Sequence, residues 1–201
     1  MNKFAFGAAL AALSLTMPGA ASAQRAPGAV IVVVDTSRIY RECNACRTAQ
    51  AQLQSQINAA QQRAQALGQP IQSEGQSIEQ AARAAANQQG AARTAAETAL
   101  QQRVTALQGR QNAANQELQR LEQNIQSSQA NVIRQINQRL NPIVTQVMTA
   151  RGANLALDTD ATLARAPALD VTAEVIAALN QQLPSVSVTP LPQQQQQPAG
   201  R

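Results

Sequence analysis

The stretch IEQAARAAANQQGAARTAAETALQQRV (residues 78–104) decides the fold, because a repeating apolar pattern ends within it and then starts again. Steps of three, four and seven residues are typical of an a/d stripe on helices that pack side by side. Before the polar break Asn87-Gln88-Gln89-Gly90, the stripe consists of Ile39, Cys43, Cys46, Leu53, Ile57, Ala60, Ala64, Leu67, Ile71, Ile78, Ala81 and Ala85. After the break, it continues as Leu100, Val104, Leu107, Ala114, Leu118, Leu121, Ile125 and Val132, then Ile136, Leu140, Ile143 and Val147. We therefore predict an antiparallel helical hairpin over residues 39–147 with its tip near residues 86–92, each arm reaching roughly 70 Å.

The segments on either side of the hairpin are strand-like. The apolar run at residues 29–34 predicts a strand buried on both faces, and Asp35 follows it as a natural helix cap. Short strands are also predicted at residues 155–158 and 162–164, before a capped amphipathic helix in residues 170–183. The predicted fold class is therefore mainly α, with the hairpin projecting from a small β-containing body made of residues 29–38 and 148–183. Within the hairpin, Pro70 predicts a kink or a broken turn.

Three short strands and one helix form a sheet fragment that is marginal when alone. Several chains that pool these segments would complete one shared core, so the sequence predicts an oligomerisation body. The apolar residues expected to form it are Val30, Ile31, Val32, Val33, Val34, Leu155, Leu157, Val175 and Leu179.

The two ends of the sequence differ from the rest in composition. Residues 1–23 have a basic start at Lys3, a short apolar run and the small-residue pattern Ala21-Ser22-Ala23, which together predict a cleaved signal peptide and export of the mature chain in soluble form. Residues 184–201 are rich in Pro and Gln and are predicted to be a disordered tail.

The composition argues against an enzyme. The sequence has no His and no Trp, and Tyr40 is the one aromatic residue outside the predicted signal peptide. Large pockets are usually built with aromatic side chains, and His is the commonest general base and metal ligand. We therefore expect no catalytic residues, no cofactor and no metal site. Asp158 and Asp160 are interpreted as a turn, because two carboxylates without further oxygen ligands rarely hold a cation.

The predicted hairpin is basic. Residues 36–150 hold eleven Arg and six Glu, a net charge of +5. A diffuse positive field attracts acidic chains or anionic headgroups, although scattered Arg on a helix is often only a solvated surface. Nucleic acid is a poor candidate partner, because there are no aromatic platforms for stacking bases. The residues expected to contact a bound chain are Arg63, Arg83, Arg93, Arg103, Arg110 and Arg120.

Cys43-Asn44-Ala45-Cys46 has the spacing of thiol oxidoreductases, which place it at the first turn of a helix after a strand. Here the pair is predicted to lie about two turns inside a helix and on the a/d stripe. The favoured interpretation is a disulfide or a pair of small seam residues. A thiol redox role stays open as an alternative, and zinc would need ligands from other subunits.

Two segments carry a resemblance to a known family. VIVVVDTSRIYRE (residues 30–42) and NLALDTDATLARAPALDVTAEVIAALN (residues 154–180) resemble the two ends of the Skp/OmpH family of periplasmic chaperones for outer-membrane proteins. The resemblance implies a homotrimer whose helical arms enclose unfolded outer-membrane proteins and prevent their aggregation without ATP. A lipopolysaccharide-binding site is associated with the family, and the resemblance does not place it on particular residues of this sequence. This sequence departs from the family in having no Lys in its arms and in the additional Cys pair. The alternative function is a structural coiled-coil spacer or tether of the cell envelope.

Overall fold

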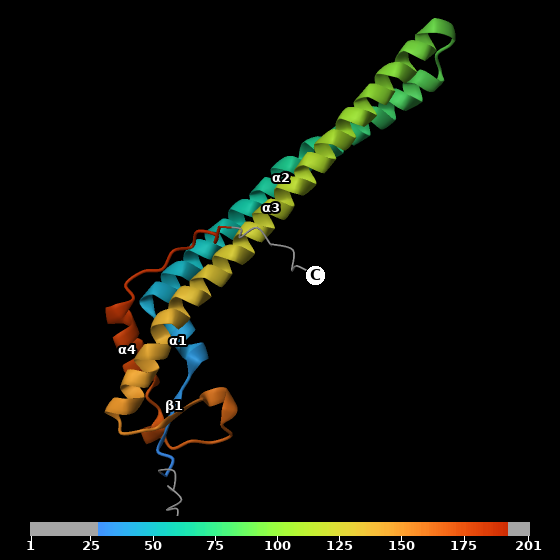
Figure 1. Cartoon of the computed structure of the whole chain (residues 1–201). Helices are drawn as coiled ribbons and strands as arrows, with labels where there is room; N and C mark the ends of the chain where they lie inside the picture. Colours follow the sequence, from blue (N-terminus) through green and yellow to red (C-terminus); the bar gives the residue numbers. More distant parts are fainter. Residues whose placement is uncertain (1–27, 193–201) are drawn as a thin grey trace, which may run out of the picture.

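The structure, a computed structural model, describes residues 28–192 and consists of a small body from which two long helices project together (Figure 1). It confirms the predicted fold class, a mainly α chain with a long helical hairpin on a body that contains a small sheet. The predicted signal peptide lies outside the described residues, as do residues 193–201 of the predicted tail.

The sheet of the body has two parallel strands. β1 (Ile31–Val34) pairs with β2 (Leu155–Asp158), with Ile31 opposite Leu155 and Val34 opposite Asp158. Residues 32–34 are buried, as the continuous apolar run predicts for a strand covered on both faces.

The third strand predicted at residues 162–164 is wrong. The backbone N–H of Thr162 donates to the carbonyl of Thr159 (3.0 Å) and closes the short 3-10 helix η1 (Thr159–Ala161), so this donor is not free for a ladder. The chain returns to the sheet later, after a second 3-10 helix, η2 (Pro167–Leu169), where Asp170 forms a single parallel bridge with Val33.

The helix that follows β1 is interrupted at Cys43. α1 (Thr36–Glu42) is capped by Asp35, whose carboxylate accepts the N–H of Arg38 at 2.7 Å. Cys43 has an extended backbone, ends α1 and serves as the N-cap of α2 (Asn44–Ala86). The cysteine pair therefore lies at the first turn of α2, and its predicted position two turns inside one helix is wrong.

The arm is formed by α2 and the antiparallel α3 (Gly90–Ala150), which are joined by residues 87–89. α2 has 43 residues and α3 has 61, so α2 alone spans about 65 Å. α2 is continuous through Pro70, so the broken turn considered there does not form. Gly152 follows α3 with a φ of 66° and ends it, because its N–H donates to the carbonyl of Thr149 at 2.9 Å.

The core of the body closes within one chain. The sheet, α1, the base of α3 and α4 (Thr172–Gln182) enclose a cluster of fully buried side chains. The largest of these are Ile39, Ile136, Ile143, Leu179, Val33, Val171 and Val175. A single chain therefore buries these residues, because its helices supply cover that the strands alone lack, and the pooling of strands by several chains stays a prediction.

Residues 184–192 are ordered along the arm, so the predicted disordered tail is wrong for this part. After α4 they run back along α2 and α3 in an extended conformation (Figure 1). Val186 and Val188 pack against the hydrophobic core, and side chains of the arm bind the backbone of the segment. The composition of this segment indicated no apolar surface to bury. Val186 and Val188 nevertheless hold the segment in place, because the groove between α2 and α3 receives them.

Candidate binding surfaces of the arm and the body

Three of the six predicted contact arginines are used inside the arm. Arg63 on α2 holds Glu117 on α3 through two hydrogen bonds, of 2.7 and 3.1 Å. Arg103 on α3 reaches back to Glu74 at 3.0 Å. Arg93 and Glu97 pair at 2.8 Å within α3. These three carboxylates are already counted in the arm's net charge of +5, so the pairing leaves that total unchanged and places the excess positive charge on the other arginines.

The hydrogen bond and charge of Arg63 lower the pKa of Glu117, and Glu117 in turn raises the pKa of Arg63. In residues 28–192, Arg83, Arg110 and Arg120 form no ion pair. They are the arginines of the predicted set that remain to supply a positive field on the outer arm. The two interhelical pairs depend on which face each helix presents to the other, so periodicity alone did not predict them, whereas the i,i+4 spacing of Arg93 and Glu97 can be read from the sequence.

The seam between the two helices is only partly covered. One side of it forms a groove of about 490 Å³, lined by Gln56, Ala59, Ala60, Arg63, Glu117, Leu121, Asn124, Ile125 and Pro190. The other side has a groove of about 330 Å³, whose lining includes Ile57, Ala64 and Leu118. Small residues leave these hollows, because Ala fills less of the space between two helices than Leu or Ile. Each groove offers apolar contact beside polar side chains.

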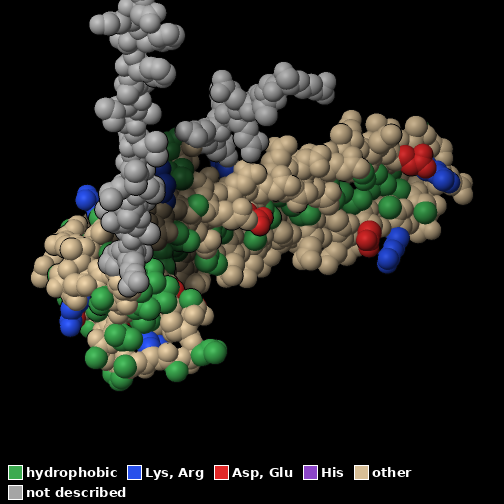
Figure 2. Space-filling model, turned by 60° about the horizontal axis from the view of Figure 1, so that its bottom comes forward, with side chains coloured by type: hydrophobic (Ala, Val, Ile, Leu, Met, Phe, Trp, Pro, Cys, Tyr) green, Lys and Arg blue, Asp and Glu red, His purple; other side chains and the backbone are tan. Residues whose placement is uncertain are grey.

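The body carries exposed apolar side chains at the end away from the arm tip (Figure 2). The exposed fraction is 51% for Val30 and 41% for Leu155, and Leu163 is fully exposed. Leu169, six residues after Leu163, is 37% exposed. Apolar side chains gathered at this end make it a candidate interaction surface.

The predicted oligomerisation residues are therefore divided between core and surface. Val32, Val33, Val34, Val175 and Leu179 are buried in the chain's own core, Ile31 and Leu157 are half-buried, and Val30 and Leu155 are exposed. Leu163 and Leu169 are also exposed but are absent from the predicted set. Two leucines in an Ala- and Pro-containing loop were the available signal.

Cys43 and Cys46 form a disulfide. Both are buried, with 0% and 4% exposure, and the N–H of Cys46 donates to the sulfur of Cys43 at 3.0 Å. A thiol-exchange partner must reach a sulfur atom, so this burial favours the structural interpretation over the redox alternative. The position of the pair at the start of α2, however, is the one that thiol oxidoreductases use.

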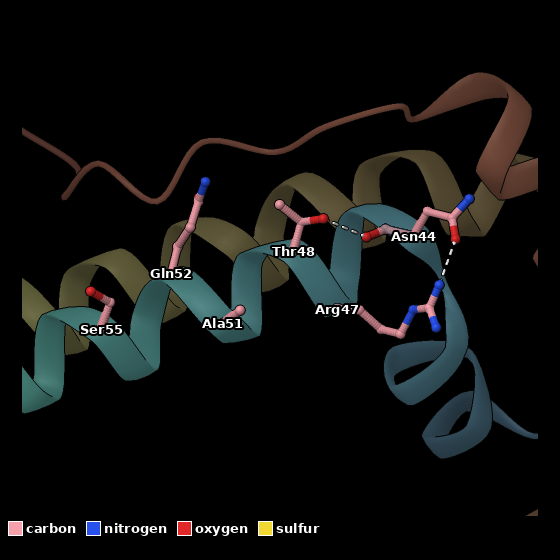
Figure 3. Close-up of a pocket in the computed structure, with 6 residues that line it drawn as sticks. All are labelled: Asn44, Arg47, Thr48, Ala51, Gln52 and Ser55. Atoms are coloured by element: carbon pink, nitrogen blue, oxygen red, sulfur yellow. Dashed lines mark hydrogen bonds between the residues drawn. The ribbon is translucent and has the colours of Figure 1, made fainter.

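A polar surface lies beside the disulfide on the first turns of α2. Figure 3 shows Asn44, Arg47, Thr48, Ala51, Gln52 and Ser55, all from this one helix, with Arg47 donating to the Asn44 side chain at 3.2 Å. None of these residues is a carboxylate, His or Cys, so the surface has no acid–base pair. In residues 28–192 no three His, Cys, Asp or Glu side chains group as metal ligands, and no helix has the length and apolar character needed to cross a membrane.

Comparisons with known proteins agree with this architecture. The family model described as outer membrane protein (OmpH-like) matches residues 30–179. A solved structure from Caulobacter crescentus CB15, described as an OmpH-like outer membrane chaperone, shares the fold with a TM-score of 0.67 and 20% identity over 85% of this chain and 96% of that one. No curated protein matches. The matched region includes the body and the whole arm, so the chain belongs to the OmpH-like outer membrane protein family.

Proposed function

We propose that this chain is an ATP-independent holdase chaperone of the periplasm, which encloses unfolded outer-membrane proteins between helical arms and prevents their aggregation. Membership of the OmpH-like family supports a chaperone role. The observation that carries the mechanism is the arm itself, a long hairpin whose seam leaves apolar grooves partly open. Many weak apolar contacts of this kind hold an unfolded chain without trapping it.

Release needs no energy source in this scheme. Each contact contributes little, because small Ala side chains and polar Gln side chains dominate the arm surface. A client that folds into a membrane gains far more apolar burial than the arm offers. Arg83, Arg110 and Arg120 add a long-range attraction for acidic segments or anionic lipid surfaces, and this attraction raises the rate of encounter rather than the strength of the hold.

Several copies would be needed to enclose a client. The exposed apolar residues of the body, including Val30, Leu155 and Leu163, support assembly through this surface, and we infer a homotrimer with three arms. Enclosure by three arms keeps a client away from other unfolded chains, which is what prevents aggregation.

The test is a dilution experiment. A urea-denatured outer-membrane β-barrel protein is diluted into buffer with and without the purified chain, and light scattering follows aggregation. We expect scattering to be suppressed at a stoichiometric ratio of trimer to client, without ATP. An oligomer that leaves the client to aggregate would contradict the holdase and favour the envelope spacer.

A further inference from the structure

The extended segment at residues 185–191, here called the strap, is held to the arm by side chains that bind its backbone. The carboxamide of Gln135 binds both polar groups of one residue, accepting the N–H of Ser187 at 3.0 Å and donating to its carbonyl at 2.9 Å. Asn131 donates to the carbonyl of Thr189 at 2.9 Å. The hydroxyl of Ser127 accepts the N–H of Leu191 at 2.9 Å. From the other helix, Gln56 donates to the carbonyl of Val188 at 3.2 Å.

These contacts follow a common repeat. Ser127, Asn131 and Gln135 are four residues apart on α3, and their partners Leu191, Thr189 and Ser187 are two residues apart on the strap. Four residues of a helix rise about 6.0 Å and two residues of an extended chain rise about 6.6 Å, so the two repeats nearly coincide. The side chains of α3 thus form a polar ladder that runs alongside an extended chain as the edge of a sheet does.

The ladder does not depend on the side chains of the strap. Each of the bonds above ends on a backbone N–H or carbonyl. Val186, Val188 and Pro190 are half-buried, whereas Ser185, Ser187 and Thr189 are exposed, so the strap alternates between an apolar inner face and a polar outer face. This alternation is the pattern of a β-strand with one buried side. Any extended chain with small apolar residues at alternate positions meets the same requirements.

The groove continues beyond the strap. Pro190 lies at one end of the hollow of about 490 Å³, and Asn124, Leu121 and the Arg63–Glu117 pair extend it toward the arm tip. The described chain fills only the part of this surface nearest the body, so a longer extended chain has room to follow the same line.

We propose that the strap groove, lined by Gln56, Ser127, Asn131, Gln135 and the hollow beyond Pro190, is a binding site for an extended, unfolded polypeptide of alternating apolar and polar residues, and that the strap is its intramolecular competitor. This inference rests on the proposed function, since strands of an outer-membrane barrel have this alternation. A tethered occupant has an effective concentration in the millimolar range, so only clients that offer many such segments displace it.

The test measures peptide binding to the full chain with the strap released. Val186→Asp together with Val188→Asp places charges at the apolar contacts of the strap, and a chain ending at Leu183 is a second release variant. The probe is a fluorescein-labelled peptide of alternating Val and Thr, unrelated in sequence to the strap, whose fluorescence anisotropy is titrated. We expect both release variants to bind it about tenfold more tightly than wild type, because an occupied site binds in proportion to its vacant fraction.

The polar ladder is tested in the variants whose strap has been released. Adding Ser127→Ala and Gln135→Ala removes ladder groups, and we expect it to weaken peptide binding about tenfold, or about 1.4 kcal/mol. The matched control adds Gln119→Ala and Gln138→Ala, which are exposed on the same helix, and keeps the affinity. A probe with N-methyl groups at alternate backbone nitrogens should bind as weakly as the unmodified probe binds the ladder variant. Circular dichroism melts confirm that each variant is folded.

Equal binding by wild type and both release variants would overturn the inference, as would a gain seen only with a peptide that copies residues 184–192. The strap would then be a structural clamp. The client-dilution experiment separates the two proposals. If the protein suppresses aggregation but shows none of these peptide effects, the proposed function stands and the strap-groove site is ruled out. If the protein shows the peptide effects but does not suppress aggregation, the strap-groove site stands and the proposed function is ruled out.

Discussion

Adjacent serines on α3 have opposite environments. The hydroxyl of Ser128 is fully buried and, in the described part of the chain, is the one buried side-chain N or O atom without a hydrogen-bond partner. The hydroxyl of Ser127, in contrast, binds both backbone groups of Leu191. A buried hydroxyl without a partner loses its hydration and gains nothing in return.

We therefore expect Ser128→Ala to raise the free energy of unfolding by about 1 kcal/mol. Ser127→Ala, the matched control one position away, should lower it or leave it unchanged, because it removes a satisfied contact. Urea denaturation followed by circular dichroism measures both. A loss of stability in Ser128→Ala would mean that its hydroxyl is bonded in solution.

Two carboxylates of the body link its segments. Asp158 caps η1 and accepts the hydroxyl of Thr36, and this hydrogen bond is the main cause that lowers the pKa of Asp158. Asp170 accepts the N–H of Thr172 at 2.9 Å and pairs with Arg165, and its hydrogen bonds with Thr172 are the main cause that lowers its pKa. A lowered folded-state pKa stabilises the fold above the unfolded-state pKa, and this contribution is lost as pH falls through the folded-state pKa.

We expect the urea midpoint to fall between about pH 5 and pH 2, the range in which carboxylates of this kind take up protons. In Asp158→Asn plus Asp170→Asn the midpoint should be lower at neutral pH and depend less on pH. Asp160→Asn, which removes an exposed carboxylate of the same turn, is the control and should keep the wild-type slope. An unchanged slope in the double variant would assign the acid sensitivity to other groups.

At the scale of the helices, the arm divides its arginines between structure and surface. Arg63 and Arg103 join α2 to α3, whereas Arg83, Arg110 and Arg120 form no close ion pair in residues 28–192. Exposed pairs of this kind add little stability, so their main effect is to cancel charge locally.

Replacing Arg83, Arg110 and Arg120 by Gln should slow the capture of an acidic unfolded chain and reduce its dependence on salt, because steering depends on summed charge. The control replaces Arg41, Arg47 and Arg139 by Gln, which makes the same change in charge at the base of the arm. This control should slow capture less. Stopped-flow fluorescence at several salt concentrations gives the capture rates. Identical salt dependence of the capture rate in all three proteins would mean that capture relies on apolar and steric contacts alone.

At the scale of the whole molecule, the body serves both as a core and as a surface. Val32 is 5% exposed within the chain's own core, whereas Leu155, opposite β1's first residue, is 41% exposed and Leu163 is fully exposed. A charge therefore has different effects at these positions, because only the first is surrounded by apolar side chains of the same chain.

Val32→Asp should destabilise the body itself by about 3 kcal/mol or more, because it buries an unpaired charge. Leu155→Asp plus Leu163→Asp should leave the helix content intact while shifting the proposed trimer to a smaller species. Light scattering coupled to size-exclusion chromatography reads the mass, and circular dichroism reads the fold. A full-size oligomer in the double variant would place the assembly surface elsewhere.

Local signals were sufficient for the hairpin and its ends. The heptad spacing, the polar stretch at residues 87–89, the cap at Asp35 and the stop at Gly152 each act within a few residues, so the sequence determined them without reference to the rest of the chain.

Only the tertiary structure decided the remaining features, because each depends on contacts between residues distant in sequence. At the break at Cys43 the disulfide to Cys46 is local, but Asn180 of α4, which accepts the N–H of Asn44 at 2.8 Å, lies 136 residues away in sequence. The pairing of Arg63 with Glu117 depends on how two helices face each other. The strap is ordered by a groove that exists only once α2 and α3 have packed. Local pattern therefore determined the elements, whereas long-range packing determined which surfaces remain free to bind.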